Sequence, residues 1–142
     1  SLASPGDLIL MTGELGAGKT CFTQGLLNGI GSAEYVRSPT FVLLMEYEGR
    51  LPLYHADLYR ISELAELETI GIEEYLNSDG ICVVEWADRF QSIFQLDHLA
   101  IKIDWDKLGP SSNTRTINLT SKGSRHTKLI DDVIDSALHK II

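Results

Sequence analysis

A glycine-rich turn close to the start of the chain limits its fold more than any other feature. The residues GELGAGKT, Gly13 to Thr20, match the pattern G-x-x-x-x-G-K-S/T in full. They follow the apolar run LILMT, Leu8 to Thr12, which indicates a short buried strand. After the turn, Phe22, Leu26 and Ile30 recur at helical spacing. The motif therefore lies between a strand and a helix, which predicts an α/β domain.

This turn has the chemistry of a phosphate-binding loop. Glycines let successive backbone N–H groups point at phosphate oxygens, and a following helix N-terminus favours an anion. Lys19 would reach the β- and γ-phosphates, and the Thr20 hydroxyl would bind Mg²⁺. A turn that only made a tight corner would require neither residue, and a buried lysine without an anion is costly. We expect the nucleotide to contact Gly13, Glu14, Leu15, Gly16, Ala17, Gly18, Lys19, Thr20 and Cys21.

Two carboxylates follow apolar runs further along the chain. Glu85 comes directly after Ile81–Val84, and Asp57 ends the run that begins at Leu53. A phosphate-binding loop needs an acidic partner that holds the metal through water and orients the attacking nucleophile, and a strand end is the expected place for it. Either residue could instead be an ordinary strand-end charge facing solvent. We predict a metal site of Thr20, Asp57 and Glu85, and catalytic roles for Glu85, Asp57 and Lys19, without choosing which carboxylate orients water.

The remaining strands predict a mixed sheet. Phe41–Tyr47 and Leu51–Asp57 are β-prone runs separated by a short turn, which indicates a hairpin. Ile81–Val84 is continuously apolar, as in a central strand covered on both faces. Leu99–Ile103 alternates with polar residues and pairs naturally with Thr116–Leu119, so we expect two antiparallel edge strands. These elements predict a three-layer α/β P-loop NTPase domain with a mixed parallel and antiparallel sheet.

Three further helical segments are expected. A short acidic helix begins near Ser62 and ends at Gly71, and a second piece spans Ile72–Leu76. The last helix carries one apolar stripe, which we interpret as a face packed on the core rather than a surface for a partner. The stripe consists of Leu129, Ile130, Val133, Ile134, Ala137, Leu138 and Ile141.

Length and charge narrow the function. The 142 residues, 44% of them hydrophobic, suit one domain spanning 1–142. Twenty acidic and twelve basic residues give a net charge of −8, with no long Lys/Arg block. Autonomous binding to a nucleic-acid backbone is disfavoured, because that binding depends on clustered cations. A basic protein partner remains compatible with this charge.

The cellular compartment can be inferred from the two cysteines and the hydropathy pattern. Cys21 and Cys82 form neither a CxxC nor a zinc pattern, and we expect both to be buried thiols in a reducing compartment. The chain has no apolar span long enough to cross a membrane and no basic-then-apolar leader. We therefore expect a cytoplasmic protein that does not bind membranes.

Four motifs in order resemble the TsaE family, also called YjeE. They are GELGAGKT, SPTF at Ser38–Phe41, HADLYR at His55–Arg60 and VEWADR at Val84–Arg89. The resemblance extends from about Gly6 to the last helix. It implies a small P-loop ATPase, with ATP and Mg²⁺, that serves bacterial synthesis of threonylcarbamoyladenosine at N6 of adenosine 37 in tRNA. It also implies work with TsaD and TsaB, slow hydrolysis by the isolated chain, and contact with tRNA only through that complex.

The resemblance also assigns individual residues. Ser38 and Thr40 fall in a nucleotide-responsive loop of the family, although Ser-Pro-Thr also suits a simple strand-entry turn. Trp86 could cover the site, face the partner or pack in the core. Arg60 could stabilise phosphoryl charge or form a structural ion pair. Family members usually begin with a further strand and helix that help to hold the base, whereas only Ser1 to Gly6 precede the first apolar run here.

Three rival functions remain testable. A GTPase would carry N-K-x-D, which is absent, and the D-x-x-G match at Asp106 to Gly109 follows an edge-like strand. A small-molecule kinase would carry an arginine-rich lid, for which the chain has no arginine cluster. A nucleotide-binding module without hydrolysis differs from an ATPase only in turnover.

Overall fold

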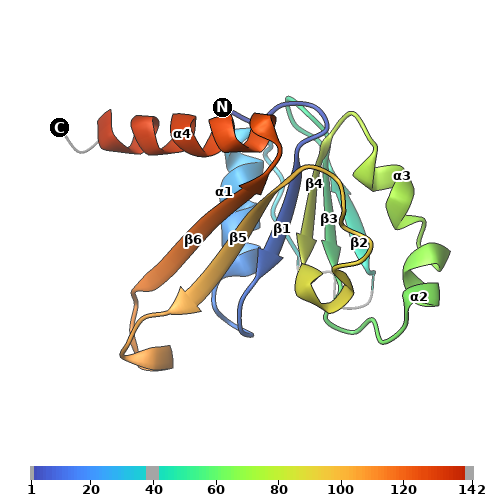
Figure 1. Ribbon diagram of the computed structural model, residues 1–142, viewed down its shortest axis with the longest axis horizontal. Coiled ribbons are helices and arrows are strands. Elements are labelled where there is room, and N and C mark those ends of the chain that lie inside the picture. Colours follow the sequence, from blue (N-terminus) through green and yellow to red (C-terminus); the bar gives the residue numbers. More distant parts are fainter. Residues whose placement is uncertain (1, 38–41, 140–142) are drawn as a thin grey trace.

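One mixed sheet forms the centre of the computed structural model, which describes residues 2–37 and 42–139. Within those ranges six strands lie in the order β2-β3-β4-β1-β5-β6 (Figure 1). The inner strands β3, β4, β1 and β5 are parallel, and β2 and β6 pair antiparallel at the two edges. This arrangement confirms the predicted fold class. The strands are β1 (Leu8–Thr12), β2 (Leu44–Tyr47), β3 (Leu53–Asp57), β4 (Ile81–Glu85), β5 (His98–Trp105) and β6 (Arg115–Lys122).

Helices cover both faces of the sheet. Side chains alternate along a strand, so Ile9 and Met11 of β1 face one layer and Leu8 and Leu10 face the other. The first layer contains α1 (Lys19–Gly29) and the start of α4 (Ser124–His139). The second contains α2 (Leu64–Thr69), α3 (Ile72–Leu76) and the 3₁₀ helix η1 (Ala87–Phe90). A further 3₁₀ turn, η2 (Gly109–Ser111), lies between β5 and β6.

The position of β5 corrects the prediction of two edge strands. Only β6 lies at that edge, because β5 pairs in parallel with β1, for example Met11 with Ile101. On its other side Ile101 pairs antiparallel with Leu119. The alternation that indicated an edge has another cause. Leu99 and Ile101 face the helices, whereas Lys102 points to the other face of β5, where its side chain is exposed. Alternation of apolar and polar residues thus indicates that helices cover one face of a strand. It does not indicate whether the strand lies inside the sheet or at its edge.

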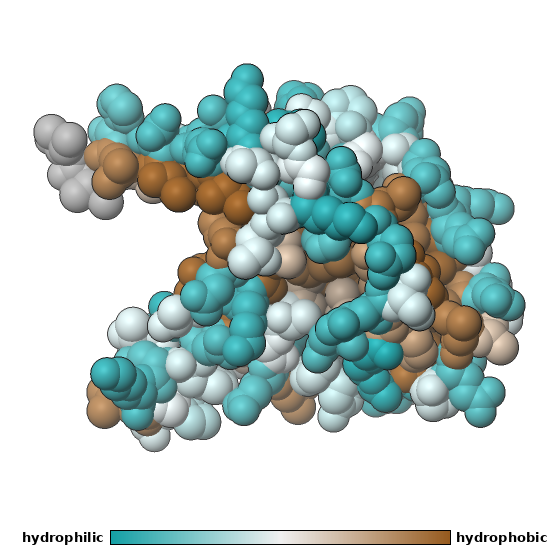
Figure 2. Space-filling model, viewed as in Figure 1, coloured by the Kyte–Doolittle hydropathy of each residue, from teal (hydrophilic) through white to brown (hydrophobic). Residues whose placement is uncertain are grey.

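The apolar stripe of α4 is only partly buried, which contradicts its prediction as a core face. Leu129 is 6% exposed, whereas Leu138 is 55% exposed. The helix runs past the edge of the sheet, so its second half has no strand beneath it (Figure 1). Figure 2 shows this half with a bare apolar underside above a hollow beside the β5–β6 hairpin. Val133 and Ile134 are exposed with Leu138, and Ile141 lies outside the described residues.

This difference in cover along α4 predicts two different mutational costs. Leu129→Ala should lower the free energy of unfolding by about 2–5 kcal/mol, since it removes a buried side chain and leaves a cavity. Leu138→Ala should change it by less than about 0.5 kcal/mol, because that side chain already meets solvent. Urea denaturation measures both. Equal costs would show that the outer half of α4 is covered in solution.

The two thiols differ in exposure. Cys82 is buried in β4, and burial raises its pKa to about 12. Cys21 is exposed on the first turn of α1, so the prediction of two buried thiols is wrong for this residue. Within residues 2–37 and 42–139, no helix combines the length and apolar character that crossing a membrane requires.

Candidate nucleotide-binding site

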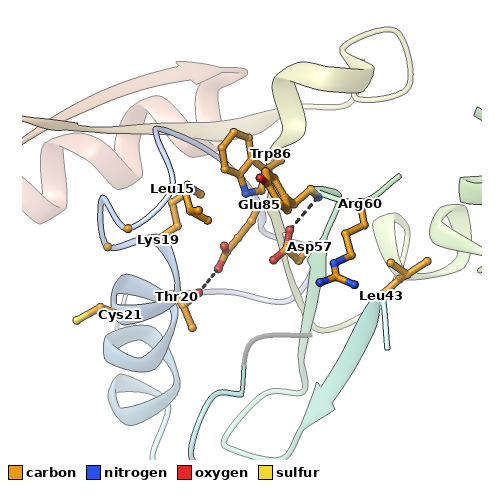
Figure 3. Close-up of a pocket in the computed structure, with 12 residues that line it drawn as sticks. Leu15, Lys19, Thr20, Cys21, Leu43, Asp57, Arg60, Glu85 and Trp86 are labelled. Carbon is orange, nitrogen blue, oxygen red and sulfur yellow. Dashed lines mark hydrogen bonds between the residues drawn. The ribbon is translucent and has the colours of Figure 1, made fainter. Parts of the chain in front are cut away.

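A cavity of about 370 Å³ opens where β1, β3 and β4 end, against the start of α1 (Figure 3). Ligands of open α/β sheets bind at the carboxyl ends of the strands, and this cavity occupies that position. Its walls combine the glycine-rich loop, both predicted carboxylates and several apolar side chains. The lining residues are Leu15, Gly16, Gly18, Lys19, Thr20, Cys21, Leu43, Asp57, Tyr59, Arg60, Glu85 and Trp86.

Two glycines allow the loop its path from β1 to α1. Gly13 has φ of 138°, and a Cβ there would lie 2.3 Å from the carbonyl oxygen of Ile103 on β5. Gly18 has φ of 116° and forms the N-cap of α1. No side chain caps this helix, and its first turn carries no acidic residue. The positive end of the helix is therefore open to an anion in the cavity.

The Lys19 ammonium lies inside the loop. Its Nζ donates hydrogen bonds to the carbonyl oxygens of Gly13, at 2.6 Å, and Glu14, at 2.9 Å. It also lies 4.1 Å from the centre of the Trp86 ring. Burial lowers the pKa of Lys19, and the nearby charges of Glu85 and then Asp57 oppose that shift. The ammonium is thus held beside the two carboxylates, where phosphate oxygens would meet it.

Glu85 is a buried carboxylate with two donors on one oxygen. The residue is 2% exposed, although it ends β4 at the cavity. Its Oε1 accepts a hydrogen bond from the Thr20 hydroxyl at 3.2 Å and lies 2.8 Å from Nε2 of His55. The predicted pairing of Thr20 with Glu85 at one site is therefore present in the geometry.

Asp57 lies next to Glu85 across the β3–β4 pair, with the two residues in register. Its Oδ1 accepts a hydrogen bond from the Tyr59 backbone N–H at 2.9 Å. Burial raises the pKa of the Asp57 carboxyl, and the negative charge of Glu85 raises it further, whereas the Tyr59 N–H lowers it. Neither carboxylate is a detached surface charge, since both line the cavity.

Trp86 has an unusual backbone that aims its ring at the site. Its φ of 61° makes it the one non-glycine residue with positive φ in the described ranges. The indole lies over Lys19 and 4.9 Å from the Tyr59 ring. Of the roles left open by the sequence, the structure shows two, because Trp86 lines the cavity and also packs against the core on the α2–α3 side of the sheet. Arg60 also lines the cavity, and Figure 3 shows it on the side of Asp57 and Leu43.

Two residues of the site were not predicted from the sequence. Leu43 lines the cavity, and Arg115 of β6 donates from Nε to the carbonyl oxygen of Ala17 at 3.0 Å. The Arg115 guanidinium also stacks 3.5 Å from the centre of the Trp105 ring. No local pattern could reveal a contact between residues so far apart in sequence. Ser38 and Thr40, predicted to bind the nucleotide, lie outside the described residues.

The oxygen donors of the cavity suit magnesium. In residues 2–37 and 42–139, no group of three His, Cys, Asp or Glu side chains forms a ready metal cluster. Mg²⁺ ordinarily binds through one or two protein oxygens together with substrate phosphates and waters. This requirement is met by the Thr20 hydroxyl and the carboxylates of Asp57 and Glu85, which could bind Mg²⁺ together with phosphates and waters.

Comparisons with known proteins give one consistent answer. The family model described as "Threonylcarbamoyl adenosine biosynthesis protein TsaE" matches residues 1–117. The tRNA threonylcarbamoyladenosine biosynthesis protein TsaE of Bacillus subtilis is 39% identical over 134 residues, covering 94% of this chain and 81% of that protein. The TsaE protein of Streptomyces coelicolor is 38% identical over 128 residues, covering 87% of this chain and 86% of that protein.

A solved structure supports the same grouping. The crystal structure of Bacillus subtilis YdiB is similar with a TM-score of 0.79 and 34% sequence identity, covering 95% of this chain and 81% of that one. The family match includes the glycine-rich loop and both strands that carry the carboxylates. The chain therefore belongs to the TsaE family, which takes part in tRNA threonylcarbamoyladenosine biosynthesis.

Proposed function

We propose that this chain binds and hydrolyses ATP in support of threonylcarbamoyladenosine formation at adenosine 37 of tRNA, together with TsaB and TsaD in the cytoplasm. One observation carries the proposal. Lys19 and Thr20 of the glycine-rich loop line the same cavity as the carboxylates of Asp57 and Glu85. Membership of the TsaE family, which takes part in threonylcarbamoyladenosine biosynthesis, supports the link of this proposed site to that pathway.

Binding follows from the loop. Its backbone N–H groups and the open end of α1 hold the phosphates, while Lys19 exchanges its carbonyl partners for phosphate oxygens. Thr20, Asp57 and Glu85 would hold Mg²⁺ directly or through water, and the ion would neutralise charge on the phosphates. The proposed contacts span Gly13 to Cys21, with Ser38 and Thr40 as further candidates.

Hydrolysis needs a positioned water. The water oxygen bonds to the γ-phosphorus as the bond to the bridging β–γ oxygen breaks, which yields ADP and phosphate and releases one proton. Glu85 orients this water, because its carboxylate is buried and held by Thr20 and His55. Asp57 would hold Mg²⁺ through a water molecule. Positioning and charge neutralisation supply most of the acceleration.

TsaB and TsaD are the proposed activators. The exposed side chains of Leu15 and Tyr59 flank the cavity, which suits a protein that docks over it. The net charge of −8 favours a basic docking surface and disfavours direct capture of tRNA. We therefore expect slow turnover by the isolated chain and contact with tRNA only through the assembled proteins.

Calorimetric titration with ATP and with GTP tests nucleotide choice. With Mg²⁺ present, we expect ATP to bind at least about 10-fold more tightly than GTP, and turnover to rise when TsaB and TsaD are added. Tighter GTP binding would favour a GTPase-like switch. Transfer of phosphate to a small acceptor would favour a kinase, and binding without turnover in the complex would leave a nucleotide-binding module.

A further inference from the structure

We propose that His55 is a positioning residue that fixes the orientation of Glu85 for the reaction. This inference rests on the proposed ATPase function and adds a residue that supports the site from within the core. His55 lies on β3 and is 0% exposed, so it touches neither solvent nor the cavity. Its influence on the reaction therefore passes through the side chain that it contacts.

The sheet brings His55 and Glu85 together. Alternation along β3 puts Leu53, His55 and Asp57 on the face toward α1, where Val83 and Glu85 of β4 also point. His55 is in register with Val83, so Glu85 is its diagonal neighbour. Leu53 and Val83 are apolar and fully buried. A polar ring among such residues is costly unless it forms a hydrogen bond, and Glu85 provides the partner.

The surroundings of the imidazole ring determine its tautomer. Nδ1 of His55 is buried and has no hydrogen-bond partner in the described residues. A proton on Nδ1 would be a buried donor without an acceptor, which is costly. The proton therefore belongs on Nε2, which donates to Oε1 of Glu85 at 2.8 Å. The bond has a fixed direction from His55 to Glu85.

Both donors to Glu85 converge on the same oxygen. The Thr20 hydroxyl also donates to Oε1, at 3.2 Å, from the opposite element α1 (Figure 3). Two donors on Oε1 hold the carboxylate in one rotation and leave Oε2 as the oxygen available to a water.

Three variants separate positioning from simple packing. His55→Leu removes the donor, His55→Gln keeps an N–H at the end of a flexible chain, and Leu53→Val trims an apolar neighbour on the same face. With TsaB and TsaD present, His55→Leu should lower kcat about 10- to 100-fold and change the KM for ATP less than about 3-fold. His55→Gln should recover at least about half of this loss on a logarithmic scale, and Leu53→Val should keep wild-type turnover. A structural role is indicated instead if kcat, KM and melting temperature change together and His55→Gln restores nothing.

Two measurements tie the effect to Glu85. In the Glu85→Gln background, His55→Leu should lower kcat by less than about 3-fold further, because the positioned group is already lost. A full second loss would overturn the proposal. In the nucleotide-free protein, nitrogen-15 NMR should find a proton on Nε2 of His55, and an Nε2 atom without a proton would also overturn the proposal. This spectrum remains informative if ATP binding by the wild type fails, so failure of the proposed function is distinguishable from failure of this inference.

Discussion

Lys19→Met is expected to weaken ATP binding at least about 100-fold, because it removes the ammonium that would meet the phosphates. Hydrogen bonds to a charged group contribute about 1.5–3 kcal/mol each, and the Nζ atom can form two or more of them. The methionine keeps the length of the aliphatic stem, so the loop retains its packing. Calorimetric titration with ATP and Mg²⁺ measures the loss.

The matched control is Lys128→Met, which removes an exposed lysine from α4, far along the chain from the glycine-rich loop. It lowers the net charge by the same amount and should leave ATP binding within about 2-fold. Thermal melting should confirm that both variants are folded. ATP affinity near the wild-type value in a folded Lys19→Met protein would exclude the proposed phosphate contact.

Glu85→Gln should retain ATP binding and lose hydrolysis by about 100- to 10,000-fold, as expected when a positioned carboxylate is removed. The amide oxygen of glutamine can still accept the hydrogen bonds from Thr20 and His55, so the core should remain intact. The amide nitrogen replaces the carboxylate oxygen that would accept a hydrogen bond from water. Single-turnover hydrolysis in the complex with TsaB and TsaD measures the change.

Two comparisons separate the role of Glu85 from general effects. Glu74→Gln removes an exposed carboxylate from α3 and should preserve turnover. Asp57→Asn should raise the Mg²⁺ concentration required for half-maximal turnover, since Asp57 is the proposed metal-water ligand. Wild-type hydrolysis by Glu85→Gln would assign the water to Asp57 instead.

The features that the sequence predicted well are local ones. The glycine-rich loop needs only a strand, a tight turn and a helix in succession, and all three are adjacent in the chain. Ile81 to Val84 is apolar throughout because helices cover both of its faces, and this pattern predicted a central strand. The strand-end position also predicted that Glu85 would lie at the site, and Glu85 does line the cavity beside Lys19 and Thr20.

The features that the sequence did not predict depend on contacts between segments that are far apart in the chain. The alternation in β5 records which face helices cover, and an inner strand with one covered face has the same pattern as an edge strand. The apolar stripe of α4 shows that the helix is amphipathic. How much of that stripe is buried depends on how far the sheet extends beneath the helix. The hydrogen bond between His55 and Glu85 depends on the register of β3 and β4. The contact of Arg115 with Ala17 depends on how the β5–β6 hairpin packs against the glycine-rich loop.

Because only one of the two thiols is exposed, the wild-type protein can be labelled at a single site. Cys82 is enclosed in the sheet with its proton firmly held, so reagents that attack thiolates reach only the sulfur of Cys21. Cys21 lines the cavity one residue after Thr20, and Figure 3 shows its sulfur pointing away from Asp57 and Glu85. A dye coupled to Cys21 would report from the first turn of α1 at the rim of the cavity, and the wild-type chain needs no added or deleted cysteine to carry it.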